Sequence, residues 1–89
     1  MPIVWDERKR LINIAQHGFD FALVESEFDF GSAVYSPAKD GRIMAIGRFK
    51  GRLSVLIFRA LGEEAISLVS LRIASKKERA AHGSQARRG

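Results

Sequence analysis

Three runs in the second half of the chain alternate apolar and polar side chains and predict consecutive β-strands. They cover residues 42–49, 52–60 and 65–72, with Lys50-Gly51 and Gly62-Glu63 at the two joints. Both joints are compatible with tight hairpins, so the three strands are expected to pair antiparallel. The middle of this sheet is apolar on both faces, which predicts full cover by helices on one side and partial cover on the other.

If both turns have two residues, the register of the sheet can be found by counting residues back from each turn. Arg48 then pairs with Leu53, and Leu53 pairs with Arg72, so the three side chains form one row on one face. A second row, at the far end of the same face, is expected to hold Arg42, Arg59 and Ile66. Between these two rows lie Ile46, Val55 and Ser70, followed by Met44, Ile57 and Leu68.

The N-terminal part of the chain has the spacing of a helix. Residues 5–21 predict a short helix that begins after an N-cap at Asp6 and ends at Gly18. Its core-facing stripe is expected to be Leu11, Ile14 and Ala15. The neighbouring polar stripe, at positions i, i+4 and i+8, consists of Lys9, Asn13 and His17.

The remaining elements complete an α+β domain. A second helix is expected over residues 21–29, with Asp20 as its N-cap and with Phe21, Val24 and Phe28 toward the core. Short strands are expected at residues 2–5 and 32–36, and a last helix at residues 74–81 with Ser75 as its cap. The predicted fold is therefore two N-terminal helices packed on a small, mostly antiparallel β-sheet with a short C-terminal helix.

The length of the chain sets its domain organisation. Eighty-nine residues leave no room for a second hydrophobic core. We assign a single domain to residues 1–82 and a flexible basic tail to residues 83–89.

Charge is distributed unevenly along the chain, whose formal net charge is +5. Residues 20–29 carry four acids and no base, while residues 42–59 carry five bases and no acid. Residues 76–89 add five bases and one acid, a net charge of +4. A basic strand region and tail attract phosphate groups, although the same charge can serve solubility alone.

Several kinds of chemistry lack their signatures. The chain has no cysteine and only two histidines, which lie far apart and form no H-E-x-x-H motif, so no metal site is predicted. No P-loop and no G-x-G-x-x-G follows a strand, so no cofactor is predicted either. No apolar run approaches a membrane span and no signal-peptide core is present, which predicts a cytoplasmic protein without membrane contact.

Arg48 and Arg72 are the first candidates for chemistry, because a guanidinium offers a rigid fork of donors to a phosphate and stays charged. Chemistry at a phosphate requires a protein to position it, stabilise the charge on it and transfer protons. His17 is the candidate for proton transfer, since imidazole titrates near neutrality. Surface ion pairs for the arginines, and a structural hydrogen bond for His17, are the alternatives.

A family resemblance supports these candidates. It begins with Trp5-Asp6, Lys9, Asn13, His17-Gly18 and Phe21, and continues through Arg42-Ile43, Ile46-Gly47, Gly51-Arg52-Leu53, Ser70, Arg72, Ala74 and Glu78-Arg79. This pattern resembles the BrnT family of bacterial toxins, which are small RelE-like ribonucleases of type II toxin–antitoxin pairs. The resemblance implies a RelE-like fold, metal-independent cleavage of RNA, and inhibition of translation and growth.

The resemblance also implies roles and partners. Arg48 and Arg72 would hold the phosphate, His17 would act as acid–base group, and Lys9, Arg52, Lys76 and Lys77 would bind RNA. The expected protein partner is a BrnA-like, DNA-binding antitoxin that covers the active surface and helps to repress the operon. A homodimer or a toxin–antitoxin heterotetramer is the expected assembly.

Four positions depart from the family pattern and leave two further hypotheses open. These positions are Arg59, Leu61, Ser67 and His82. One hypothesis is a catalytically silent toxin-like module that is kept for antitoxin binding and operon control. The other is a plain RNA-binding domain without an antitoxin.

Overall fold

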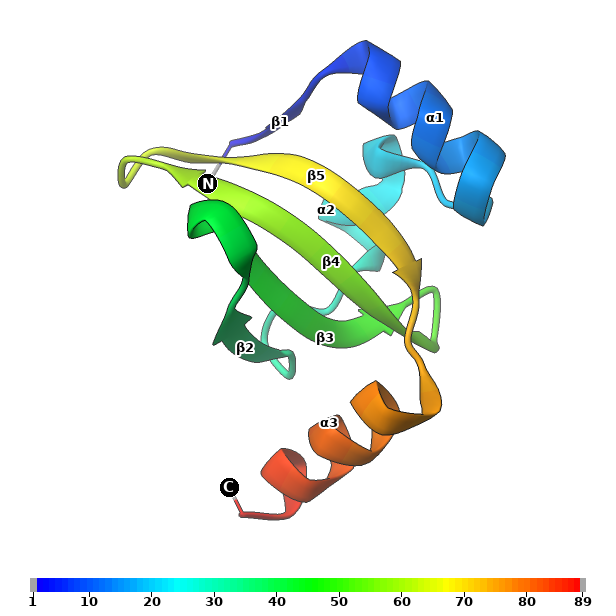
Figure 1. Ribbon diagram of the computed structural model, residues 1–89, viewed down its shortest axis with the longest axis vertical. Helices are drawn as coiled ribbons and strands as arrows, with labels where there is room; N and C mark the ends of the chain where they lie inside the picture. Colours follow the sequence, from blue (N-terminus) through cyan, green and yellow to red (C-terminus); the bar gives the residue numbers. More distant parts are fainter. Residues whose placement is uncertain (1, 89) are drawn as a thin grey trace.

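A five-stranded sheet forms the centre of the computed structural model, which describes residues 2–88, with side chains as far as residue 84. The strands lie in the order β1-β5-β4-β3-β2, and each neighbouring pair is antiparallel except β1 with β5. Their bounds are Ile3–Trp5 (β1), Val34–Pro37 (β2), Ile43–Phe49 (β3), Arg52–Leu61 (β4) and Ala65–Ile73 (β5). The helical segments are α1 (Glu7–His17), η1 (Phe21–Leu23), α2 (Val24–Glu27), η2 (Lys39–Gly41) and α3 (Lys76–Arg88). The predicted α+β class and mostly antiparallel sheet are confirmed (Figure 1).

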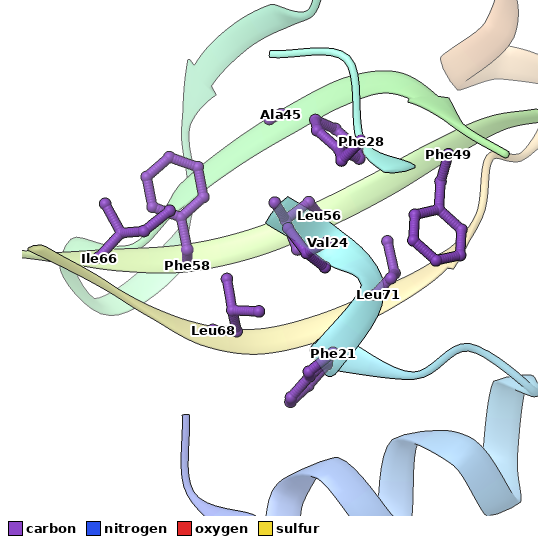
Figure 2. Packing of buried hydrophobic residues seen from close by; sticks show 10 residues of the cluster. All are labelled: Phe21, Val24, Phe28, Ala45, Phe49, Leu56, Phe58, Ile66, Leu68 and Leu71. Carbon is purple, nitrogen blue, oxygen red and sulfur yellow. The ribbon is translucent and has the colours of Figure 1, made fainter. Parts of the chain in front are cut away.

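The main core lies between the sheet and the short segment formed by η1 and α2. Phe21, Val24 and Phe28 are buried there, as the sequence predicts. The strands contribute the other buried members of this cluster, namely Ala45, Phe49, Leu56, Phe58, Ile66, Leu68 and Leu71. Figure 2 shows these side chains between the α2 segment and the strands. Because α2 is only one turn long, most of its contribution to the fold comes from this packing rather than from helix propensity.

Gly47 allows the chain after α2 to pass close to the sheet. A Cβ atom at this position would lie 3.0 Å from both the Cβ of Ala33 and the Cζ of Phe28, and 3.2 Å from the carbonyl oxygen of Asp29. Asp29 also donates its backbone N–H to the carbonyl of Arg48 over 2.9 Å. Glycine is therefore the residue that lets this loop lie against β3.

Helix α1 lies along the edge of β5 instead of covering a face of the sheet. The side-chain amide of Asn13 donates to the carbonyl of Leu71 over 2.9 Å and accepts from its N–H over 3.0 Å. The same amide nitrogen donates to the carbonyl of Phe19 over 2.9 Å. Asn13 thus continues the sheet edge where β1 ends, since the last β1 pair joins Trp5 to Leu68.

This placement makes the predicted core-facing stripe of α1 wrong. Leu11 is 55% exposed, Ala15 is exposed and Ile14 is half-buried, while Asn13 is only 5% exposed. The reason is that the helix meets a sheet edge, whose backbone groups need polar partners, and not an apolar face. The predicted ends are confirmed: the Asp6 side chain accepts from Arg8 N–H, and Gly18 is left-handed with φ +76°.

The first hairpin has the predicted register. Phe49 lies opposite Arg52 and Arg48 lies opposite Leu53. Both turn residues have positive φ, 51° at Lys50 and 78° at Gly51, as a type I′ turn requires.

The predicted register of the second hairpin is wrong. Leu61 pairs with Ala65, so the loop has three residues rather than two. A bulge between Ile57 and Phe58 then leaves Val69 of β5 without a partner, because Ile57 pairs with Ser70 and Phe58 pairs with Leu68. Each irregularity shifts the pairing by one residue.

The two shifts have different consequences along β5. Arg72 has moved by two residues, lies opposite Val55 instead of Leu53, and so remains on the predicted face. Leu68 and Ile66 have moved by one residue, which turns them to the opposite face and buries them in the α2-side core. The predicted row of Arg42, Arg59 and Ile66 is therefore wrong as well, because Arg59 lies opposite Ser67.

Three other element bounds differ from the prediction. The second helix is a 3-10 turn followed by a single α-turn, and it ends at Phe28 with extended φ and ψ. The strand after it covers Val34–Pro37 instead of residues 32–36. Helix α3 runs to Arg88 instead of ending at residue 81. The flexible tail expected over residues 83–89 stays a prediction, and residue 89 lies outside the described residues.

None of the helices in the described part of the chain combines the length and apolarity of a membrane span.

Candidate functional site

The sheet face opposite α2 carries the candidate chemistry, and we call it the arginine face. Its residues alternate with those of the main core along β3, β4 and β5. They are Arg42, Met44, Ile46, Arg48, Leu53, Val55, Ile57, Arg59, Ser67, Ser70 and Arg72. In Figure 1 α2 is drawn behind the strands, so the arginine face is turned toward the reader.

Helices α1 and α3 border this face on opposite sides. Helix α1 contacts β5, whereas α3 contacts β3 and β2 (Figure 1). Ala74, just before α3, packs with the buried side chains of Ile46 and Val55. Met44 and Ile57 are only half-buried. The middle of the face is therefore apolar and partly open, with charged groups around it.

Helix α3 is held at its N-terminus and again near its middle. A capping box closes its N-terminus: the Glu78 carboxylate accepts from Ser75 N–H over 2.8 Å, and Glu78 N–H donates to Ser75 Oγ over 3.2 Å. Further along, His82 Nε2 lies 3.2 Å from the carbonyl oxygen of Ser32, so the ring donates there when Nε2 carries the proton. This contact gives His82 a structural role.

Arg72 forms a two-pronged ion pair with Glu78. Its Nη1 and Nη2 donate to the two carboxylate oxygens over 2.7 Å and 2.8 Å. The hydrogen bond from Arg72 is the main cause that lowers the pKa of Glu78 to about 2, with further bonds from Ser75 acting in the same direction. For Arg72 the structure thus shows the ion-pair alternative that the sequence left open. Glu78 is a carboxylate at neutral pH and cannot serve as a general acid there.

Arg48 is exposed and lies at the end of β3 that leads into the first hairpin. Its Nη1 donates to the carbonyl of Gly51 over 3.4 Å, a long hydrogen bond. It does not share a row with Arg72, because Arg48 lies opposite Leu53 while Arg72 lies opposite Val55. The two arginines share the face but belong to neighbouring rows.

The other sequence candidates lie on several different elements. His17 is exposed at the last residue of α1. Arg52 is exposed at the start of β4 and lies opposite the buried Phe49, so its side chain points to the α2 side of the sheet. Lys76 and Lys77 are exposed in the first turn of α3. The structure places Lys9 in a small cleft with Arg42, a residue that sequence reasoning did not single out. The roles of all these residues remain predictions.

A cleft larger than the one beside Lys9 lies on the α2 side and has a different character. It has a volume of about 580 Å³ and is lined mostly by apolar side chains, including Phe30, Ile43 and Phe58. Among the described lining residues, Glu25 is the charged one. A cleft of this kind does not suit a phosphate backbone. Within the described side chains, no cluster of three or more His, Asp or Glu residues could hold a metal ion.

Comparisons with known proteins identify the class. A family model described as "Ribonuclease toxin, BrnT, of type II toxin-antitoxin system" matches residues 5–78. The chain is also similar to the crystal structure of the Brucella abortus ribonuclease toxin BrnT, with 51% sequence identity and a TM-score of 0.77. That match covers 85% of this chain and 99% of the Brucella chain. No curated protein matches the chain.

These matches place the chain among the ribonuclease toxins of type II toxin–antitoxin systems. Within that class it belongs to the BrnT family. The ribonuclease hypothesis is thereby favoured over the silent module and over the plain RNA-binding domain.

Proposed function

We propose that this chain is an endoribonuclease that cleaves RNA bound across the arginine face without a metal ion, and so inhibits translation and growth. The observation that carries the proposal is the arrangement of this face. Arg48 is exposed opposite the half-buried Leu53, and the half-buried Met44 and Ile57 lie further along the same face. Phosphates can contact the cations while unstacked bases contact the apolar middle, as single-stranded RNA binding requires.

The proposed reaction uses the nucleophile that RNA itself supplies. The 2′-hydroxyl loses its proton and attacks the adjacent phosphorus, the bond from phosphorus to the 5′-oxygen breaks, and that oxygen receives a proton. The products are a 2′,3′-cyclic phosphate and a 5′-hydroxyl. Arg48 stabilises the charge that develops on the phosphate. His17, exposed at the end of α1, transfers protons.

Arg72 has donors left for a phosphate despite its ion pair. A guanidinium has five N–H groups. Two donate to Glu78, and Nη1 also approaches the carbonyl of Ile73 at 3.3 Å. The proposed role of Glu78 is to fix the orientation of the Arg72 guanidinium, whose remaining donors meet the phosphate. Lys9, Arg52, Lys76 and Lys77 bind the flanking RNA backbone in this proposal.

A type II toxin–antitoxin family implies an antitoxin as partner. We propose a BrnA-like, DNA-binding antitoxin that covers the arginine face and joins the toxin in an operon-repressing heterotetramer. A homodimer of the free toxin is the corresponding proposal for the unbound state. The cytoplasm is the proposed location, because RNA and such a repressor meet there.

Arg48→Ala tests the proposed site. We expect the purified variant to cleave total RNA in excess EDTA at least about 100-fold more slowly than the parent, because a charge-stabilising donor of the transition state is lost. Arg8→Ala is the matched control: Arg8 is exposed on α1, on the side of Leu11 and Ala15, and loses the same charge.

Equal cleavage by the parent and by Arg48→Ala would place the active site elsewhere. No cleavage by the parent, with and without ribosomes, would instead support the catalytically silent module. Circular dichroism of both variants shows whether a loss of activity reflects a loss of fold.

A further inference from the structure

A second, smaller cleft lies where the sheet edge passes from β1 to α1. It has a volume of about 220 Å³. Helix α1 lines one wall, β5 contributes the bulge residue Val69 and its neighbour Ser70, and Arg42 reaches the cleft from the start of β3. The cleft exists because β1 stops opposite Leu68, whereas Asn13 takes over the edge only at Leu71. Residues 69–70 lie between these two edge partners.

The lining of this cleft is cationic. Lys9 and Arg42 bring two positive charges, and no carboxylate is among the described lining residues. Gln16 and Ser70 add neutral hydrogen-bonding groups. Glu7, the acid of α1, is engaged elsewhere, because it pairs with Arg10, which also pairs with Asp20 before η1.

Arg42 adds a second, independent observation. Its Nε is buried and has no hydrogen-bond partner in the described part of the chain. Among the described residues, this is the one buried side-chain nitrogen or oxygen atom that lacks a hydrogen-bond partner. Buried guanidinium donors are normally paired, so Arg42 lacks the protein partner that such a group usually has, beside a cleft that already carries positive charge.

We infer that this cleft is an anion subsite in which Arg42 and Lys9 bind one phosphate of the RNA backbone, away from the scissile phosphate. The identification of RNA as the natural ligand rests on the proposed ribonuclease function. Pockets for whole small molecules measure about 300–1,000 Å³, so the cleft suits one phosphate better than a complete nucleotide. A guanidinium and an ammonium that approach from two different elements provide the directional and the point-charge contacts that bind a phosphate.

The position of the subsite gives it a specific role. Arg42 and Arg48 lie at opposite ends of β3, about 20 Å apart along the strand at roughly 3.3 Å per residue. A phosphate in the cleft and a scissile phosphate at Arg48 are therefore several nucleotides apart on one RNA strand. The subsite raises the affinity for RNA that is long enough to reach both places and leaves the chemical step unchanged.

Inorganic phosphate is the first probe, because it tests the cleft without any RNA. Titration followed by ¹⁵N chemical shifts should move the signals of Gln16 and Ser70 in a saturable way at constant ionic strength. Arg42→Gln should abolish this response and Lys9→Gln should weaken it at least about threefold. The response should persist in Arg8→Gln, which removes a charge from the same helix outside the cleft. Equal saturation in Arg42→Gln and the parent, saturation at another place, or no saturation would overturn the subsite.

RNA length supplies the second readout. Arg42→Gln should raise KM for a long single-stranded RNA about tenfold with kcat unchanged, and should leave cleavage of a dinucleotide unaffected. A parent that binds phosphate in the cleft but cuts no RNA would refute the ribonuclease proposal and keep the anion subsite. A parent that cuts RNA, with the same KM in Arg42→Gln, would refute the subsite alone.

Discussion

At the scale of single residues, Asn13 shows how a polar side chain can replace a strand. Its amide presents one donor and one acceptor to Leu71, as the next peptide of a sheet would. The amide does so at a site where only 5% of Asn13 is exposed. A helix pattern read from sequence treats an asparagine between isoleucines as a polar-face residue, so this role was not predicted.

Removing that amide should destabilise the fold. Asn13→Ala leaves the buried N–H and carbonyl of Leu71 without partners, which costs about 1–3 kcal/mol for each unpaired group. We expect urea unfolding to show a loss of about 3 kcal/mol in the free energy of unfolding, and a similar loss for Asn13→Leu, which restores the volume. Gln16→Ala, one turn away and exposed, should stay within about 0.5 kcal/mol. An unchanged midpoint of urea unfolding for Asn13→Ala would refute the role of Asn13 at the sheet edge.

At the scale of elements, the predictions from sequence are correct for features that a few adjacent residues determine. They are wrong for features that depend on how two elements meet. The caps at Asp6 and Asp20 and the type I′ hairpin depend on a few adjacent residues, and all three are confirmed. The second hairpin depends on a three-residue loop and on the bulge at Val69, and a turn rule that counts two residues cannot detect either. The alternation of β3 does place Arg42 and Arg48 on one face. The meeting of Arg42 with α1, however, requires the tertiary position of that helix, which the sequence does not provide.

The ion pair between β5 and α3 should make stability depend on acidic pH. Glu78 has a pKa of about 2 in the folded protein against an ordinary value of 4.5. Because the folded-state pKa is depressed, the stabilisation is fully present above about pH 4.5 and is lost as the pH falls toward 2.

The Glu78 side chain is 19% exposed and that of Arg72 is 35% exposed, so solvent reduces the effect to about 1–2 kcal/mol. Glu78→Gln should lower the free energy of unfolding by that amount at pH 7 and should flatten its decline between pH 4.5 and 2. Glu25→Gln, exposed on α2, is the control. Parallel pH profiles for the parent and Glu78→Gln would show that the pair contributes nothing to stability.

At the scale of the whole molecule, the sheet separates two kinds of surface. The α2 side carries the four acids of residues 20–29, while the arginine face carries its cations around an apolar middle. Four arginines, Arg42, Arg48, Arg59 and Arg72, therefore bring positive charge to the side where the proposed substrate binds. An RNA strand is repelled from one side of the sheet and attracted to the other, which orients it before any specific contact forms.

This separation predicts the salt dependence of RNA binding. Each phosphate contact with a single strand contributes about −0.7 to the slope of log affinity against log salt concentration, so three contacts, at Lys9, Arg42 and Arg48, predict a slope of about −2. Fluorescence anisotropy with a 2′-O-methyl RNA, which cannot be cut, measures this slope. Arg42→Gln and Arg48→Gln should each reduce its magnitude by about 0.7, and Arg8→Gln should leave it unchanged. A slope near zero, or equal losses in all three variants, would mean that RNA binds through diffuse charge and not across the arginine face.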